Sequence, residues 1–160
     1  IWALDILRNN GFKYDSSIYP VRHPDYGISG FRQNIHEING MLEVPMTALS
    51  FCGFKIPISG GGYFRLSPYW LFRTLLQDRS APDDIVTYFH PWEFDYEQPR
   101  INLPLLKKFR HYVGLKQNRD KFERLLNDFH FVPIEQIIKN HNLLTHATVQ
   151  LNSLDQRAAY

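Results

Sequence analysis

Residues 85–93 have the sequence IVTYFHPWE, and this stretch decides more of the expected fold than any other. Its first five residues are β-branched or aromatic, which is typical of a strand buried in a parallel sheet. Pro91 ends such a strand because proline has no N–H to donate to a neighbouring strand. His90 is therefore predicted at the carboxyl end of a buried strand, where α/β barrels collect their catalytic side chains.

Predicted helices and strands alternate on both sides of this stretch. The strands expected from aromatic and β-branched runs are residues 12–19, 42–47, 54–59 and 131–132. The helices expected from apolar periodicity and end signals are residues 1–9, 67–76, 105–113, 122–129 and 133–139. This alternation predicts an α/β layered or barrel protein. A complete eight-fold barrel needs about 250 residues, so 160 residues suffice only for half of one.

The connections carry their own signals. Residues 20–40 have no clear period and are predicted to form a long loop. Three consecutive glycines at 60–62 predict a flexible turn, and Ser67 before Pro68 is expected to cap the next helix. The chain opens at Ile1 without an initiating Met and without a residue that could cap its first helix, so we expect a C-terminal portion of a longer protein.

Composition excludes several classes of protein. Apolar residues make up 44% and charged residues 21% of the sequence, which indicates a globular chain with a buried core. The formal net charge of +2 and the lack of like-charge runs argue against a nucleic-acid partner or a polybasic membrane patch. No apolar run approaches the roughly 18 residues of a transmembrane helix. A single cysteine, Cys52, excludes a disulfide framework and a Cys-rich zinc module.

The seven histidines form no H-x-x-x-H pair, which would place two metal ligands on one helix face. His141 and His146 have the spacing of half a zinc finger, but one cysteine cannot supply the other half. We therefore expect no metal site within this chain.

The segment around His90 is the strongest candidate site. An imidazole at a strand end can exchange protons near neutral pH, although it can also satisfy a loop backbone group. Trp92 offers an apolar face to a sugar ring, with ordinary packing as the alternative. Glu93 is either an anchor for the site or an exposed acid.

Weaker candidates lie elsewhere in the sequence. Asp15 could orient a ligand or a histidine, or it could close a local Asx turn. Tyr63 and Arg65 follow the three glycines, a pattern that is only loosely similar to a phosphate-binding loop and fits a tight turn equally well. His23 and Tyr26 could line a pocket, with a solvated loop as the alternative.

Five segments together carry a family resemblance. They are WALDIL at 2–7, GFKYDSSIYP at 11–20, LEVP at 42–45, GGGYFR at 60–65 and FHPWE at 89–93. In this order they resemble the polysaccharide deacetylases of the NodB-homology class (carbohydrate esterase family 4), and within it the subgroup from exosortase-associated exopolysaccharide loci. Residues 103–113 and 122–133 also resemble the C-terminal extension of that subgroup, so the resemblance covers residues 1 to about 135.

This resemblance implies a distorted (β/α) barrel and a hydrolase that removes acetyl groups from N-acetylated sugars. An Asp and two His would hold a divalent metal, usually zinc, and a second Asp would activate the attacking water. A late histidine would protonate the leaving amine, and His90 matches that residue. The other matching segments contain the candidate substrate-binding residues Asp15, Tyr63, Arg65, Trp92 and Glu93.

The metal ligands of the family have no counterpart in this chain. The Asp-Asp, H-x-x-x-H and Arg-x-Pro motifs are expected upstream of Ile1, so the chain is expected to be inactive alone and to bind no metal itself. Residues 1–100 would form the C-terminal half of the deacetylase domain, residues 101–140 a helical extension and residues 141–160 a weakly ordered tail.

Two functions follow as hypotheses. The first is the C-terminal part of a deacetylase acting on an N-acetylated polysaccharide in exopolysaccharide production. The second is a non-catalytic module that binds glycan or a partner subunit. The resemblance implies a bacterial protein, either cytoplasmic or associated with the cell envelope.

Overall fold

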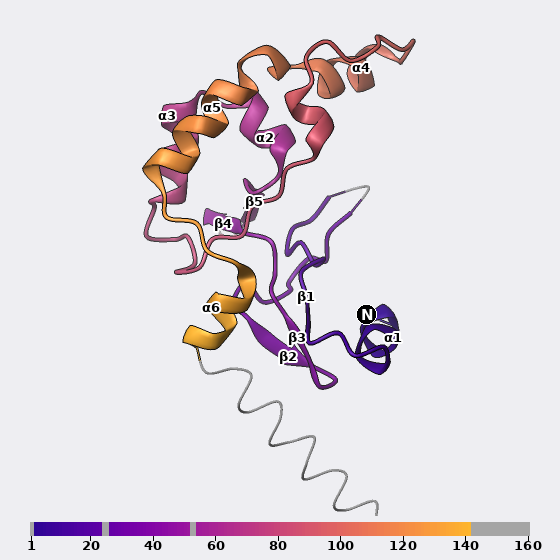
Figure 1. Cartoon of the computed structure of the whole chain (residues 1–160), viewed down its shortest axis with the longest axis vertical. Coiled ribbons are helices and arrows are strands. Elements are labelled where there is room, and N and C mark those ends of the chain that lie inside the picture. Colours follow the sequence, from indigo (N-terminus) through magenta and orange to yellow (C-terminus); the bar gives the residue numbers. More distant parts are fainter. Residues whose placement is uncertain (1, 24–25, 52–53, 142–160) are drawn as a thin grey trace, which may run out of the picture.

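The structure is a computed structural model that describes residues 2–23, 26–51 and 54–141. Most of its helices gather at one end of the molecule, and a small sheet lies at the other end beside α1 and α6 (Figure 1). The helices are α1 (Trp2–Asn9), α2 (Gly61–Leu66), α3 (Tyr69–Leu76), the 3₁₀ helix η1 (Pro91–Phe94), α4 (Leu105–Tyr112), α5 (Leu115–Asp128) and α6 (Ile134–Asn140). The strands are β1 (Tyr14–Asp15), β2 (His36–Ile38), β3 (Met41–Glu43), β4 (Ala48–Phe51) and β5 (Phe54–Pro57).

Strand β3 is the centre of a three-stranded sheet with the order β1-β3-β2. Strand β1 runs parallel to β3 and β2 runs antiparallel to it, so that Asp15 and His36 are both in register with Glu43. Asn39 and Gly40 join β2 to β3, each with a positive φ, of 52° and 77°. Two positive φ angles define the tight turn that asparagine followed by glycine favours. The prediction of one long loop over residues 20–40 is therefore wrong for its last part.

The predicted strands are shorter in the structure than in the sequence patterns. Residues 12–19 contribute only β1, because side chains replace part of the strand pairing in the residues that follow it, although the Met46 N–H still donates to the Ile18 carbonyl at 2.9 Å. Ser16 donates to the Val44 carbonyl, and the Ile18 N–H donates to the Glu43 carboxylate. The predicted runs at 42–47 and 54–59 are confirmed only as β3 and β5.

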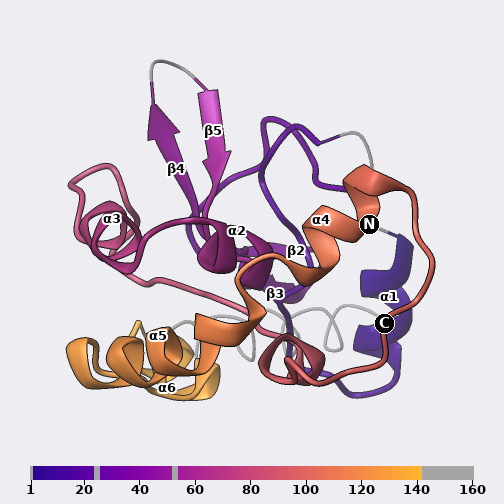
Figure 2. The ribbon, with the colours of Figure 1, turned by 90° about the horizontal axis from the view of Figure 1, so that it is seen from above.

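One strand was not predicted, and one further strand prediction is wrong. The sequence patterns do not predict strand β4, yet it pairs antiparallel with β5 in a two-stranded ribbon that extends from the body of the molecule (Figure 2). Residues 131–132 lie outside any strand. The described strands form these two sheets without closing a barrel, so the chain is a mixed α/β protein and half a barrel stays a prediction.

The stretch that includes residues 85–89 is extended but is not a regular strand. Within the part of the chain that the structure describes, only Tyr88 of this stretch makes a parallel bridge, opposite Gly60. The Tyr88 N–H donates to the Ser59 carbonyl at 3.0 Å, and the Gly61 N–H donates to the Tyr88 carbonyl at 3.1 Å. The prediction of a buried parallel strand is thus wrong in extent, although this one bridge still sets the direction in which the chain reaches His90.

Helix α2 replaces the flexible turn that the three glycines predicted. Ser67 ends this helix instead of capping the next one, because both its N–H and its hydroxyl donate to the Tyr63 carbonyl. Pro68 takes the capping position of α3. The predicted helices at 1–9, 105–113 and 133–139 are confirmed as α1, α4 and α6, and α5 begins earlier than the predicted 122–129.

The helical end of the molecule packs around Phe64 of α2. Its ring contacts Phe72 and Phe89 edge-on, at centroid distances of 4.7 and 5.1 Å. Leu76 of α3 and Leu125 of α5 belong to the same buried cluster, with Leu49 and Ile58. A second cluster includes Leu42 of β3, Val44 and Ile138 of α6, and so joins β3 to α6. Burial of these side chains provides the main stabilisation of the fold.

Helix α4 is the exception to this packing. The side chains of Leu105, Leu106 and Phe109 are 88, 67 and 56% exposed, although the sequence predicted an apolar stripe there.

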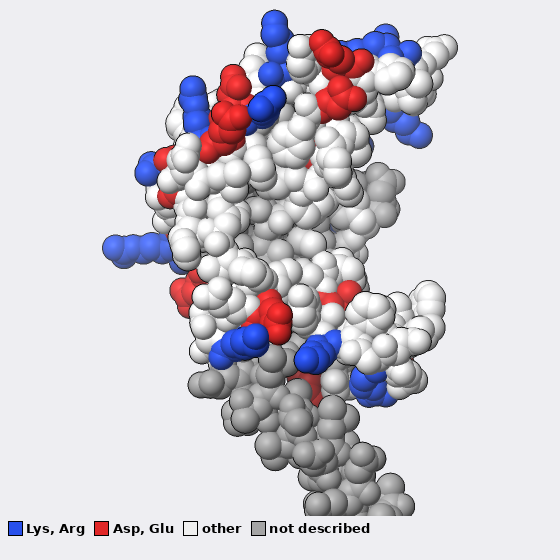
Figure 3. Space-filling view, in the orientation of Figure 1, with Lys and Arg blue, Asp and Glu red and all other residues white. Residues whose placement is uncertain are grey.

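On the face shown in Figure 3, acidic and basic side chains are interspersed without a large patch of one sign. None of the described helices is long and apolar enough to cross a membrane. The predicted tail at 141–160 lies, except for His141, outside the described residues.

Candidate functional site

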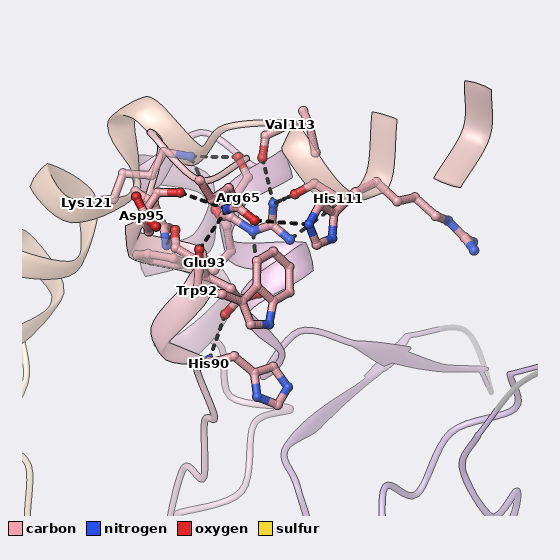
Figure 4. A network of polar contacts seen from close by, with 12 residues as sticks. Arg65, His90, Trp92, Glu93, Asp95, His111, Val113 and Lys121 are labelled. Carbon is pink, nitrogen blue, oxygen red and sulfur yellow. Dashed lines mark hydrogen bonds and ion pairs between the residues drawn. The ribbon is translucent and has the colours of Figure 1, made fainter. Parts of the chain in front are cut away.

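The site is built on η1, which follows the single bridge at Tyr88. His90 occupies the position before η1 and is exposed. Glu93, at the third position of the same turn, is buried. The carboxylate of Glu93 accepts the N–H of His90 at 3.0 Å, and the Glu93 N–H donates to the His90 carbonyl at 3.0 Å. These reciprocal bonds fix the backbone of the turn, and the exposed imidazole points away from Glu93 (Figure 4).

A buried ion pair lies beneath this turn. Arg65 Nε lies 3.4 Å from Glu93 Oε1, and the two side chains are only 2 and 3% exposed. A Cβ atom at Gly61 would lie 1.8 Å from Glu93 Oε2. The glycine run of residues 60–62 therefore has a specific function in packing, because only glycine at position 61 leaves room for the Glu93 carboxylate.

Arg65 also binds the end of helix α4. Its guanidinium donates to the carbonyls of Arg110, His111 and Val113, at 3.3, 2.8 and 3.0 Å. These carbonyls lie at the C-terminal end of a helix, where no N–H of the helix itself reaches them. Burial lowers the pKa of Arg65, and the Glu93 carboxylate opposes that effect. One buried cation thus joins α2, η1 and α4.

Helix α5 holds the same group from the other side. Lys121 Nζ donates to the carbonyls of Phe64, Arg65 and Ser67, at the end of α2. Asn118 donates to the Glu93 carbonyl at 2.9 Å. The predicted extension at 101–140 therefore contacts the site directly through both α4 and α5.

Aromatic rings surround Trp92. The Arg65 guanidinium carbon lies 4.9 Å from the indole centroid, and the His111 ring lies parallel to the indole at 4.5 Å with an interplanar angle of 13°. His90 is also nearly parallel to the indole, at 6.3 Å. Tyr88 meets His90 edge-on at 5.6 Å. His90 thus lies within a group of ordered rings.

Tyrosines extend this aromatic group towards the loop after β1. The Tyr63 and Tyr26 hydroxyls are 2.8 Å apart, and Tyr26 stacks on His23 at 3.8 Å and on Tyr19 at 5.9 Å. Burial raises the pKa of Tyr63, and it raises that of Tyr88 as well. Both phenols therefore keep their protons at neutral pH and can donate hydrogen bonds. The structure thus brings His23 and Tyr26 together with Tyr63, and a pocket lined by His23 and Tyr26 stays a prediction.

Asp15 lies apart from the His90 group. It is on β1, where its carboxylate accepts the Ser17 hydroxyl and lies in register with Glu43. Among the described residues, no hydrogen bond joins Asp15 to His90 or Trp92. Its role as a substrate contact stays a prediction.

The most unusual acid in the chain, Glu43, is absent from the candidates predicted from the sequence. Glu43 is 0% exposed, its Oε1 accepts the Ile18 N–H at 3.0 Å, and its Oε2 has no hydrogen-bond partner among the described residues. Burial, with a smaller contribution from Asp15, raises the pKa of Glu43 to about 7. The sequence does contain a signal that could have identified Glu43, because it is an acidic residue between the apolar residues Leu42 and Val44. His111, Asn118 and Lys121 carried no such local signal.

No metal centre can be assembled from the part of the chain that the structure describes. These residues contain no group of three or more His, Cys, Asp or Glu side chains that could hold a metal ion. Cys52 lies outside the described residues.

The sequence matches the family described as "Domain of unknown function (DUF3473)" over residues 16–139. This match includes β2 to β5 and all the helices except α1, apart from the last residue of α6. No curated protein and no solved structure matches the chain.

Proposed function

The chain belongs to the DUF3473 family, and on that premise we propose that it is the C-terminal part of a polysaccharide deacetylase of the NodB-homology class. The enzyme would hydrolyse N-acetyl groups on an amino-sugar polymer in exopolysaccharide biosynthesis. Two observations support this proposal. The family is associated with polysaccharide deacetylases, and the segments at 60–65 and 89–93, which resemble those enzymes, fold against each other.

The exposed imidazole of His90 on a fixed backbone carries the proposal. Its N–H and carbonyl are both bonded to Glu93, and Glu93 is held by buried Arg65. A proton donor must keep its position while the reacting atoms change, and such a rigid support provides this.

The chemistry assigned to His90 is general acid catalysis. A carboxylate base, which the resemblance assigns to a second Asp, takes a proton from water as the water oxygen adds to the acetamide carbonyl carbon. The tetrahedral oxyanion that forms collapses as the bond between carbon and nitrogen breaks. An amine leaves readily only if it gains a proton, so His90 in its protonated form donates that proton to the nitrogen. The products are acetate and the free amine of the sugar.

The remaining site residues form two groups, one partly accessible to solvent and one buried. Trp92 and Tyr88 are rings beside His90, and Tyr63 is bonded to Tyr26. All three keep part of their surface accessible, and they are proposed to contact the sugar. Arg65 and Glu93 are nearly inaccessible, so we assign them to positioning the turn rather than to touching the substrate.

The resemblance also implies a divalent metal, most commonly zinc. The described residues do not fit that ion, because they contain no suitable group of ligands. The chemistry assigned to this chain is therefore limited to the proton transfer by His90 and the residues that support it.

The test is acetate release from N-acetylglucosamine oligomers by the full-length protein. We expect His90→Ala to reduce kcat by about 10²–10⁴-fold, the usual contribution of a general acid. The variant should keep the wild-type thermal stability because His90 is exposed. The control is Glu37→Gln, at an exposed position of β2, which should retain full activity. Wild-type kcat in His90→Ala would contradict the assigned role.

A non-catalytic binding module is the second candidate, and the exposed apolar face of α4 favours it. Leu105, Leu106 and Phe109 project into solvent, which is typical of a surface that binds another protein. A full-length protein that binds the oligomers but releases no acetate under any metal condition would support this alternative.

A further inference from the structure

His111 reaches the site from helix α4, outside every motif that identified the site. We propose that His111 is a positioning residue that holds the Trp92 indole in place for the sugar. This inference rests on the proposed function, since it assumes that Trp92 contacts the substrate. It also gives the helical extension a defined task at the site.

The ring of His111 is oriented by Gln98. The Gln98 amide nitrogen donates to the carbonyls of Trp92 and Asp95, at 3.0 and 2.7 Å. An amide oxygen in that place would face two carbonyl oxygens, so this orientation of Gln98 is determined by its neighbours. Gln98 Oε1 must then accept the hydrogen bond from His111 Nε2, at 3.1 Å.

The indole is held by two planar groups that come from different helices. Arg65 lies 4.9 Å from its centroid and His111 stacks on it at 4.5 Å. Gln98 fixes the backbone of Trp92 and the ring of His111 at the same time. Loss of the His111 ring would leave Arg65 in place and open one side of the indole, so Trp92 could adopt other rotamers.

The side chain of His111 can be changed without removing its backbone from the fold. Arg65 binds the carbonyl of His111, which every variant keeps. The ring itself is only half-buried. Variants at this position therefore test the ring and not the attachment of α4.

The first measurement follows the indole N–H resonances of the three tryptophans by NMR, assigned with Trp92→Phe. Trp2 and Trp70 are 76 and 68% exposed and provide references for exposed indoles. His111→Ala should move the Trp92 resonance towards these references, because the ring current of the stacked imidazole is lost. His111→Phe should keep the resonance displaced, and Glu37→Gln should leave it unchanged.

The second measurement is the kinetics of acetate release by the full-length protein. His111→Ala should raise KM about tenfold and leave kcat unchanged, because it weakens binding in the ground state and the transition state alike. His111→Phe should restore the wild-type KM. His90→Ala should show the opposite pattern, a loss of kcat.

These results would overturn the inference in distinguishable ways. An unchanged Trp92 resonance in His111→Ala would show that the stack does not order the indole. A changed resonance with an unchanged KM, in an active enzyme, would show that the order does not matter for the sugar. A wild-type protein without deacetylase activity would remove the proposed function and this inference with it.

Discussion

Two buried glutamates, one at the helical end of the molecule and one in the small sheet, lie in very different surroundings. Glu93, at the helical end, forms an ion pair with the Arg65 guanidinium and accepts the His90 N–H. Its carboxylate fits against Gly61, which has no side chain. Glu43, in the small sheet, has one N–H from Ile18 and, among the described residues, no cation within an ion-pair distance. Each residue is at most 2% exposed.

The difference lies in what each carboxylate can do. The Glu93 carboxylate lies beside a buried cation of opposite charge and accepts the His90 N–H, so it ties Arg65 and the turn together. A buried carboxylate with a single donor favours the protonated form, and the pKa of Glu43 is accordingly raised to about 7. The first arrangement supports a rigid catalytic turn, whereas the second makes the stability of the sheet depend on pH.

The largest effect is expected at Arg65. Arg65→Met leaves Glu93 buried without its cation and removes the donors to three carbonyls of α4. Breaking a buried ion pair from one side costs about 3–5 kcal/mol. Urea unfolding followed by circular dichroism measures this loss.

The double variant Arg65→Met/Glu93→Gln sharpens the result. A neutral amide can still accept the His90 N–H and leaves no buried charge, so the double variant should be more stable than Arg65→Met alone. A single variant that loses less than about 1 kcal/mol would mean that Arg65 does not stabilise this group.

The second effect is the pH dependence from Glu43. Its pKa is about 7 in the folded protein and 4.5 in the unfolded chain, so the folded state binds more protons between these values. The free energy of unfolding must then fall as the pH rises from 4.5 to 7, by up to about 3 kcal/mol, and stay low above 7. Urea unfolding from acidic to mildly alkaline pH measures this slope.

Glu43→Gln should remove this slope, because the amide accepts the Ile18 N–H and does not ionise. It should be more stable than the wild type above the folded-state pKa and similar to it at the acidic end of the range. The control is Glu37→Gln, at an exposed position of neighbouring β2, which should keep the wild-type slope. Equal slopes in Glu43→Gln and the wild type would refute the assignment to Glu43.

The smallest effect tests the space beside Glu93. Gly61→Ala should cost about 1–3 kcal/mol, because the new methyl group would overlap the Glu93 carboxylate. Gly62→Ala in the same helix is the matched control, since no atom lies within 4 Å of its Cβ position. It should stabilise α2 by about 0.5–1 kcal/mol. Equal effects of the two changes would contradict the close approach of Glu93.

Local signals in the sequence predict a good part of the structure. Gly11 and Gly114, each with a positive φ, mark where α1 and α4 end, and Pro133 precedes α6. The segment that contains His90, Trp92 and Glu93 can be recognised as a site because its members are adjacent in the chain. The turn at Asn39 and Gly40 also has a local sequence signal, asparagine followed by glycine, but the prediction of a long loop over residues 20–40 did not use it.

Strand pairing and the support of the site could not be predicted in the same way. Residues 85–89 have the composition of a strand, but among the described residues their one bridging partner is Gly60, which lies 28 positions before Tyr88. Arg65 meets Glu93 and His111 only after the chain has folded, and neither contact has a periodic signature. Buried pairs between distant segments depend on tertiary packing, which overrides local preference.

The proton donated by His90 is tested most directly by comparing two leaving groups in the full-length protein. The measurement is the rate of acetate release from an N-acetylated sugar oligomer and from an aryl acetate ester, each with the wild type and His90→Ala. A phenolate leaves without a proton and an amine does not, so we predict at least about a hundredfold loss with the oligomer and a loss of only a few-fold with the ester. An equal loss on both substrates would contradict the role of His90 as the acid.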